Sequence, residues 1–257
     1  MEVFGKYSEL YNLLYYDKDY SQEVDYVIKK LDEYNCPSKK ILEFGSGTGI
    51  HGCLLAEKGF EINGVELSEN MFQNAKTYIE KKGLTQKFKI YCDDISKFVS
   101  NEKFGAVISL FHVISYLNTN EAILKTFENA SFQLEKGGLF IFDIWYAPAV
   151  LTLKPQNKIK EIENDILKLF RFTEPQSRFN DNIVDVNFKI LIYDKQTNKI
   201  SYLEEKHSMR YFSIPEITLI ANLNEFEVLK AEEFLTGKAP SENTWGVCFI
   251  LRKKNNE

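Results

Sequence analysis

The 257-residue chain is predicted to fold as an α/β protein, with a doubly wound, mostly parallel sheet and an inserted antiparallel β lid. Three observations predict this class. Between Lys39 and Asp143, short apolar runs alternate with helix-like segments, which is typical of βαβ units. After Pro148, longer strand-like segments follow one another directly. A hydrophobic content of 44% and an aromatic content of 14% allow a large core.

The first half of the chain predicts five strands separated by helices. We expect the strands at Lys40–Phe44, Glu61–Glu66, Phe88–Cys92, Gly105–Leu110 and Leu139–Asp143. We expect helices at Ile50–Lys58, Glu69–Lys82 and Asn120–Leu134. Ser68 is placed to cap the second helix, and Gly59 and Gly83 are placed to end the first two. A turn over residues 135–138 then leads into the fifth strand.

The second half predicts antiparallel strands and a return to the main sheet. The expected long strands are Ile166–Phe172, Ile183–Tyr193 and Lys199–Phe212. A helix over Pro215–Asn222 and strands over Glu227–Glu232 and Thr244–Arg252 complete one edge. The predicted units are therefore a core with an N-terminal helical cap over residues 1–150, a β lid over 151–214 and a return to the core over 215–257.

Composition and charge narrow the function classes. The net charge is -5 and the basic residues are scattered, so we expect a small-molecule substrate and no nucleic acid. We expect no membrane span, because the apolar runs are far shorter than the roughly 20 residues that cross a bilayer. No signal-peptide pattern is visible, which predicts a cytoplasmic protein. The four cysteines are isolated, so neither disulfides nor a metal site is expected, and a homodimer is left open.

The strongest motif is the glycine loop after the first strand. In Glu43-Phe44-Gly45-Ser46-Gly47-Thr48-Gly49 an acidic residue is followed by three alternating glycines at a strand-to-helix turn. Glycine is required where a Cβ would collide with a ligand lying against the backbone. A dinucleotide loop reads G-x-G-x-x-G, and its third glycine would fall on Ile50 here. The loop therefore indicates a Rossmann-like domain for a different cofactor.

This loop resembles the first motif of the class I methyltransferases that use S-adenosylmethionine (SAM). The resemblance implies that Glu43 holds the methionine end of SAM, above Gly45, Gly47 and Gly49. It also implies that Glu66 accepts the ribose hydroxyls and that Asp94 binds the adenine amino group. For each of these acids taken alone, the alternative is a solvated loop residue or a helix cap. The remaining cofactor positions implied by the resemblance are Tyr11, Tyr20, His51, Leu67, Ile95 and Leu110.

Within that family the chain is most similar to enzymes that methylate the amino group of nucleotide-linked deoxysugars. The similarity covers Tyr7–Tyr11, Lys18–Tyr20, Gly47–His51 and Trp145–Pro148. It implies that the N-terminal tyrosines close over the methionine part of SAM. The alternative is a helix that packs these tyrosines on the core.

The acceptor site is expected beyond the carboxyl ends of the strands, in the loops after the fourth and fifth strands. His112 is the first candidate for a general base; the alternative is a histidine that bonds a loop carbonyl. The histidine that sugar N-methyltransferases can carry in this loop matches Tyr116 here, which is the second catalytic candidate. The expected substrate-binding residues are Asp143, Trp145, Tyr146, His207, Arg210 and Trp245.

Residues on one strand cannot all face the acceptor. In the last lid strand, His207 shares a face with Met209 and Tyr211, whereas Arg210 faces the other way. One of the two is expected to touch substrate, and a surface position for Arg210 is the alternative. Trp245 is expected to form an apolar wall, with ordinary core packing as its alternative.

The sequence thus predicts an enzyme that transfers a methyl group from SAM to an amine or hydroxyl of a small polar acceptor and releases S-adenosylhomocysteine. The favoured acceptor is a nucleotide-linked or phosphorylated sugar-like precursor of a surface polysaccharide or natural product. The alternatives are an O-methyltransferase for another phosphorylated metabolite, a non-catalytic SAM-binding protein, and a nicotinamide-dependent oxidoreductase. Glu43 and Ile50 argue against the last of these.

Overall fold

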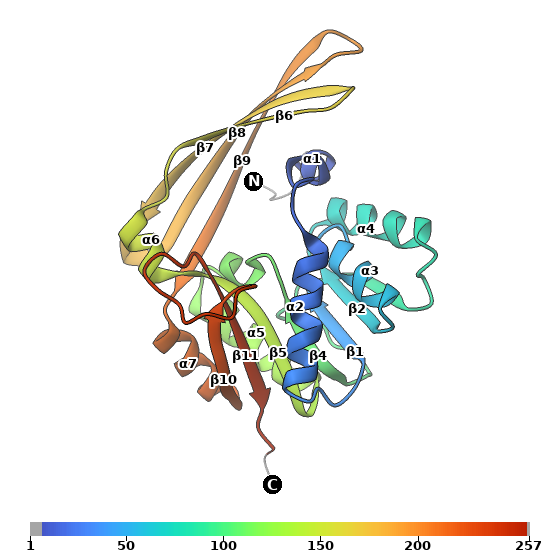
Figure 1. Ribbon diagram of the computed structural model, residues 1–257, viewed down its shortest axis with the longest axis vertical. Coiled ribbons are helices and arrows are strands. Elements are labelled where there is room, and N and C mark those ends of the chain that lie inside the picture. Colours follow the sequence, from blue (N-terminus) through green and yellow to red (C-terminus); the bar gives the residue numbers. More distant parts are fainter. Residues whose placement is uncertain (1–6, 256–257) are drawn as a thin grey trace.

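The computed structural model describes residues 7–255 and has a mixed α/β fold (Figure 1). The centre of its sheet is parallel, in the order β3-β2-β1-β4-β5. These strands span Lys40–Phe44 (β1), Glu61–Glu66 (β2), Phe88–Cys92 (β3), Phe104–Ser109 (β4) and Leu134–Tyr146 (β5). Beyond β5, β11 (Gly246–Lys253) and then β10 (Phe226–Glu233) pair antiparallel. The predicted fold class is confirmed.

Helices cover both faces of this sheet because alternate strand residues are apolar on each side. Ile41 and Ile108 pack with one group of helices, which are α2 (Tyr20–Glu33), α3 (Ile50–Glu57) and α4 (Glu69–Lys81). Leu42 and Val107 pack with the other group, which are α5 (Asn120–Gln133) and α7 (Ile214–Leu223). Because helices cover both faces of the sheet, the loops at the carboxyl ends of the strands are the expected place for a ligand-binding site.

A second, antiparallel group of strands extends away from the central sheet (Figure 1). It consists of β6 (Lys158–Glu163), β7 (Leu167–Arg178), β8 (Ile183–Asp194) and β9 (Lys199–Phe212). β9 joins the central sheet through parallel pairing of Tyr211 with Trp145. The short helix α1 (Tyr7–Leu14) packs Leu10 and Leu14 into the core of this group. The remaining short helices are η1 (Val113–Tyr116), α6 (Ala147–Leu153) and η2 (Phe179–Asp181).

β7 extends to Arg178, beyond the predicted end at Phe172, and three further elements differ from the prediction. β5 begins at Leu134, so the predicted turn over residues 135–138 lies within an irregular start of the strand, where Gly137 has a φ of 72°. β6 was not predicted, because its alternating lysines and glutamates are typical of an exposed edge strand rather than a core strand. α6 was also missed; it begins next to Pro148, which suits the first helical turn. The proposed division at residues 150 and 214 stays a prediction.

Candidate cofactor and acceptor site

The glycine loop lies at the carboxyl ends of β1 and β2. Gly45, Gly47 and Gly49 have φ values of 72°, 56° and 78°, which L side chains rarely adopt. The Gly45 N–H donates to the carbonyl of Val65 at 2.8 Å, which fastens the loop to β2. A Cβ on Gly45 would lie 2.5 Å from the Val113 methyl groups, whereas a Cβ on Gly47 would meet nothing within 4 Å. The loop therefore presents open backbone at Gly47.

Glu66, at the end of β2, is bound to this loop. Its Oε2 accepts the Gly47 N–H at 2.8 Å and its Oε1 accepts the Ser68 N–H at 2.9 Å. Burial raises the pKa of Glu66, and the two backbone N–H groups oppose that shift. Each carboxylate oxygen has a second lone pair, so Glu66 can still accept two ribose hydroxyls. Leu67 follows it with 70% of its surface exposed, available to cover a ring.

Glu43, next to the last residue of β1, lies in an environment that disfavours the charged form of its carboxyl group. The side chain is 2% exposed, and its Oε2 has no hydrogen-bond partner among residues 7–255. Burial, with a further contribution from the charge of Glu66, raises the pKa of Glu43 to about 8. A buried carboxyl without a cation is costly, so this position is suited to an ammonium group supplied by a ligand.

The predicted methionine-end residues gather around α2. The His51 Nε2 lies 2.6 Å from the Glu23 Oε2, and the Tyr20 ring packs on His51 with centroids 4.9 Å apart. Burial is the main cause of the lowered pKa of His51. Lys18 forms an ion pair with Glu23. Sequence reasoning gave no role to Glu23 or Lys18, although Lys18 stands in the quoted Lys18–Tyr20 segment.

Tyr11 belongs to an aromatic chain that reaches the loop after β4. Its ring centroid lies 4.8 Å from that of Tyr15, which in turn contacts Phe111 edge-on at 5.1 Å. Tyr11 also packs against the core of the antiparallel strands. The structure thus shows the packing that was left open as the alternative, and Tyr11 stays a predicted cofactor contact.

Asp94, at the expected adenine end, caps a turn. Its Oδ1 accepts both the N–H and the hydroxyl of Ser96, at 2.9 and 2.8 Å. Burial works against ionisation, but the bonds from Ser96 and the nearby Lys97 hold the pKa of Asp94 below its usual value. Ile95 is buried and its carbonyl accepts the amide of Asn129 at 2.7 Å. Asp94 therefore caps a turn rather than a helix, and the adenine contact stays a prediction.

The acceptor end is built on a histidine–carboxylate pair. The His112 Nδ1 lies 2.7 Å from the Asp143 Oδ2, and the His112 backbone N–H donates to both oxygens at 3.1 and 3.2 Å. Asp143 is 1% exposed; burial raises its pKa, but the charge and hydrogen bonds of His112 outweigh this and lower it. Trp145 packs edge-on to His112 at 6.4 Å and to Trp245 at 6.1 Å. The structure brings these four predicted residues together.

Tyr116 and His207 form a second polar pair. The Tyr116 hydroxyl lies 2.6 Å from the His207 Nδ1, which connects η1 to β9. Burial is the main cause that raises the pKa of Tyr116 well above its usual value. The His207 Nε2 lies 3.6 Å from the Glu205 Oε1, beyond good hydrogen-bond distance. Sequence reasoning did not foresee that β9 delivers a histidine to the loop after β4.

Two predicted acceptor residues lie apart from this group. Arg210 is 8% exposed and donates to the Asn120 Oδ1 at 2.8 Å and to the Glu216 Oε1 at 2.7 Å, so its guanidinium is engaged by protein groups. The alternative of a surface arginine is therefore wrong, because Asn120 of α5 and Glu216 of α7 lie against the guanidinium, and its contact with substrate stays a prediction. Tyr146 packs with the core on the α5 and α7 side, opposite Trp145. Leu110 is likewise a buried core residue.

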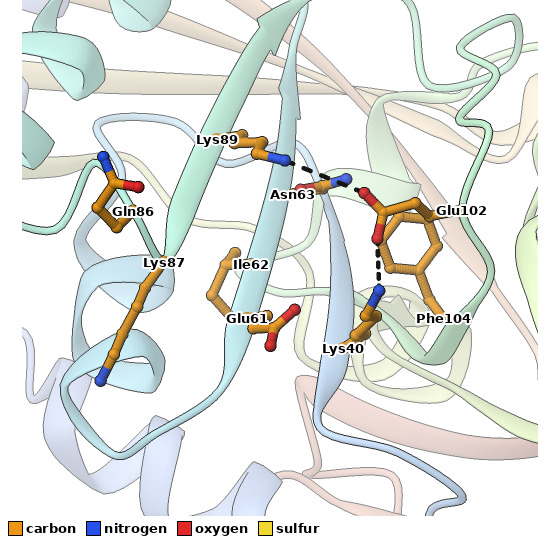
Figure 2. Close-up of a pocket in the computed structure, with 9 residues that line it drawn as sticks. All are labelled: Lys40, Glu61, Ile62, Asn63, Gln86, Lys87, Lys89, Glu102 and Phe104. Carbon is orange, nitrogen blue, oxygen red and sulfur yellow. Dashed lines mark hydrogen bonds and ion pairs between the residues drawn. The ribbon is translucent and has the colours of Figure 1, made fainter.

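A small cavity of about 50 Å³ lies at the other end of the parallel strands (Figure 2). It is lined by residues at the starts of the strands, including Lys40, Glu61 and Phe104, and the Lys40 Nζ lies 2.6 Å from the Glu102 Oε2 across it. Ligands of open α/β sheets bind at the carboxyl ends of the strands. This cavity is therefore not the candidate site.

Two kinds of feature are absent from residues 7–255. No group of three or more histidine, cysteine, aspartate or glutamate side chains is placed to hold a metal ion. In the same residues, no helix combines the length and hydropathy needed to span a membrane.

Comparison with known proteins agrees with this geometry. Residues 41–138 match the methyltransferase domain family. YqeM of Bacillus subtilis is 22% identical over 252 residues, which are 98% of this chain and 97% of that protein. The dTDP-3-amino-3,4,6-trideoxy-alpha-D-glucopyranose N,N-dimethyltransferase of Streptomyces venezuelae is 27% identical over 144 residues, 55% of this chain and 58% of its own.

The fold is also found in solved structures. A crystal structure of an S-adenosylmethionine-dependent methyltransferase from Clostridium acetobutylicum has a TM-score of 0.82, covers 97% of this chain and 98% of its own, and is 22% identical. Its likeness concerns the fold, whereas the family match covers the glycine loop and the strands that hold Glu43, Glu66 and Asp94. The predicted resemblance is therefore confirmed: residues 41–138 match the methyltransferase domain family, and nearly the whole chain shares the fold of a SAM-dependent methyltransferase.

Proposed function

We propose that the chain methylates an amine or hydroxyl of a small polar acceptor, a nucleotide-linked or phosphorylated sugar-like precursor of a surface polysaccharide or natural product. The observation that carries this proposal is the His112–Asp143 pair beside Trp145 and Trp245. The likeness to a dTDP-amino-sugar N,N-dimethyltransferase supports the acceptor class.

The cofactor residues divide the work of holding SAM. Glu43 faces the α-ammonium, the open backbone at Gly47 lies against the cofactor, and Glu66 accepts the ribose hydroxyls. Leu67 and Asp94 lie at the adenine end. SAM, when bound, supplies the methyl group and a thioether leaving group, so the protein has to align the acceptor and exclude water.

His112 is the proposed proton acceptor. The Asp143 Oδ2 lies 2.7 Å from the His112 Nδ1 and stabilises a proton on that atom, so the Nε2 lone pair of the neutral ring is the one that takes the proton in this proposal. Since the ring is 24% exposed while Asp143 is buried, the histidine rather than the aspartate meets the acceptor. Asp143 thus acts as a positioning residue behind His112, and not as the direct substrate contact that the sequence suggested.

The nature of the acceptor decides how much this base contributes. A hydroxyl loses its proton as it attacks the methyl group, and general-base help is worth about 100- to 10,000-fold. A neutral amine already has a free lone pair, so His112 contributes less. Tyr116, backed by His207, is the second candidate to bond the acceptor.

The experiment is methyl transfer from SAM to a panel of dTDP-amino sugars, dTDP-hydroxy sugars and sugar phosphates, with S-adenosylhomocysteine release as the readout. Turnover with a sugar nucleotide supports the proposal. Turnover restricted to other phosphorylated metabolites would replace the acceptor class. SAM binding without turnover on any acceptor would support the non-catalytic alternative.

A further inference from the structure

Lys18 is a buried lysine in the segment between α1 and α2. Its side chain is 10% exposed, and its ammonium forms an ion pair with Glu23. The same ammonium lies 4.4 Å from the ring centroids of both Tyr20 and Phe111. Covering an ammonium is costly unless it is paired, and Glu23 and the two rings supply that compensation in the ligand-free fold.

The positive charge of Lys18 affects residues on both the glycine-loop side and the acceptor side of the site. It lowers the pKa of His51, at the start of α3, although burial is the larger cause there. It also lowers the pKa of Asp143, on β5, although burial, which raises that pKa, and His112, which lowers it, have larger effects. Lys18 contacts Phe111 in the loop after β4 and Glu23, which is bound to His51 of α3, so it lies between the glycine-loop side and the acceptor side of the site.

The amino-acid part of SAM carries one positive and one negative group, which need different partners. Glu43 is buried and its Oε2 has no partner among the described residues, which suits the α-ammonium of SAM. The α-carboxylate is attached to the same carbon as that ammonium. It would be repelled by Glu43 and Glu23 unless a cation lay beside it.

We propose that Lys18 binds the α-carboxylate of SAM while Glu43 binds the α-ammonium. An ammonium has three N–H donors, so Lys18 can bond a second carboxylate while it keeps Glu23. The Tyr20 and Phe111 rings hold its stem and head in place, and Glu23 is itself held by His51. This assignment rests on SAM as the cofactor and extends it to a residue in the connection before α2.

The test compares ligands that differ only in the amino-acid part. Lys18→Met keeps the length and apolar stem of the side chain and removes its charge. By calorimetry we expect Lys18→Met to weaken S-adenosylhomocysteine binding about 10- to 100-fold, the range of a charge-assisted hydrogen bond. Binding of 5′-methylthioadenosine, which lacks the amino-acid part, should not change. Lys58→Met, which removes an exposed ion pair with Asp25, is the matched control and should bind both ligands normally.

A second comparison keeps the test decisive if Lys18→Met folds poorly. Decarboxylated S-adenosylhomocysteine keeps the ammonium and lacks the carboxylate, so the wild-type protein should bind it about 10- to 100-fold less tightly than the parent ligand. Lys18→Arg should retain most of this discrimination, and Lys18→Met should lose it. Equal wild-type affinity for both ligands, or equal loss of both adenosine ligands in Lys18→Met, overturns the role of Lys18. Failure of the wild-type protein to bind S-adenosylhomocysteine or methylthioadenosine would instead overturn the cofactor assignment.

Discussion

Phe111 and His112 hold the acceptor end of the site in an unusual backbone conformation. Their φ values are 64° and 62°, and each left-handed residue that is not glycine costs about 1 to 3 kcal/mol. The hydrogen bonds from the His112 backbone to Asp143 offset this cost. The strained turn places Phe111 against Tyr15 and Lys18 and places the His112 ring against Trp145.

Replacement of His112 should separate chemistry from cofactor binding. In His112→Ala we expect turnover with a hydroxyl acceptor to fall about 100-fold or more, and turnover with an amine to fall only slightly. Asp143→Asn should lower the same rate, because it no longer stabilises the protonated ring. S-adenosylhomocysteine affinity, measured by calorimetry, should stay near normal in both. A folded His112→Ala protein with full activity on a hydroxyl acceptor would remove His112 from the mechanism.

Glu66 tests the ribose contact. Glu66→Ala would leave the Gly47 and Ser68 N–H groups without their buried acceptor, so it would disturb the loop as well as the ligand. Glu66→Gln keeps one oxygen and the side-chain shape. We expect Glu66→Gln to weaken S-adenosylhomocysteine binding about 10-fold or more while the unfolding temperature changes little. Unchanged affinity in calorimetry would show that Glu66 does not hold the ribose.

Among the elements, the glycine loop is the most restrictive. Gly45→Ala combines a φ of 72° with a Cβ only 2.5 Å from Val113, whereas Gly59→Ala has a φ of 94° and meets nothing within 4 Å. Left-handed strain alone costs about 1 to 2 kcal/mol. We therefore expect Gly59→Ala to lose about that much stability and keep ligand affinity, and Gly45→Ala to lose more stability and most of its affinity. Urea unfolding and calorimetry measure the two effects; equal behaviour of both variants would contradict this role of the loop.

The individual strands and loops show how much of the fold the sequence predicts. Strands β1 to β4 were placed within a residue because their apolar runs are bounded by loop signals, and the glycine loop identified the cofactor end. β6 was not predicted from the sequence, because its charged edge residues give no periodic apolar pattern. Local sequence pattern does not encode contacts between residues far apart in the chain. His112 and Asp143 are 31 residues apart, and Tyr116 and His207 are 91 residues apart. The contacts of Arg210 with Asn120 and Glu216 could not be predicted either, because the pattern of a strand does not show which distant residues lie against it.

For the whole molecule, Glu43 links stability to pH. Its pKa of about 8 in the ligand-free fold exceeds the ordinary value of 4.5, so between these values the folded state holds a proton that the unfolded state has lost. Stability should therefore fall as pH rises through this window. Glu66, whose pKa is also raised, acts in the same direction. The free energy of unfolding of Glu43→Gln, measured in urea from pH 5 to 8, should fall less than that of wild type; parallel curves would contradict a protonated Glu43.

The most direct measurement is calorimetric titration of the protein with S-adenosylhomocysteine, with NADH as the control. Binding of S-adenosylhomocysteine alone is the predicted result, since the loop lacks the third glycine of a dinucleotide site and the buried Glu43 Oε2 is left for a ligand ammonium to bond. Binding of NADH, or of neither ligand, would mean that the glycine loop and its carboxylates do not form a SAM site.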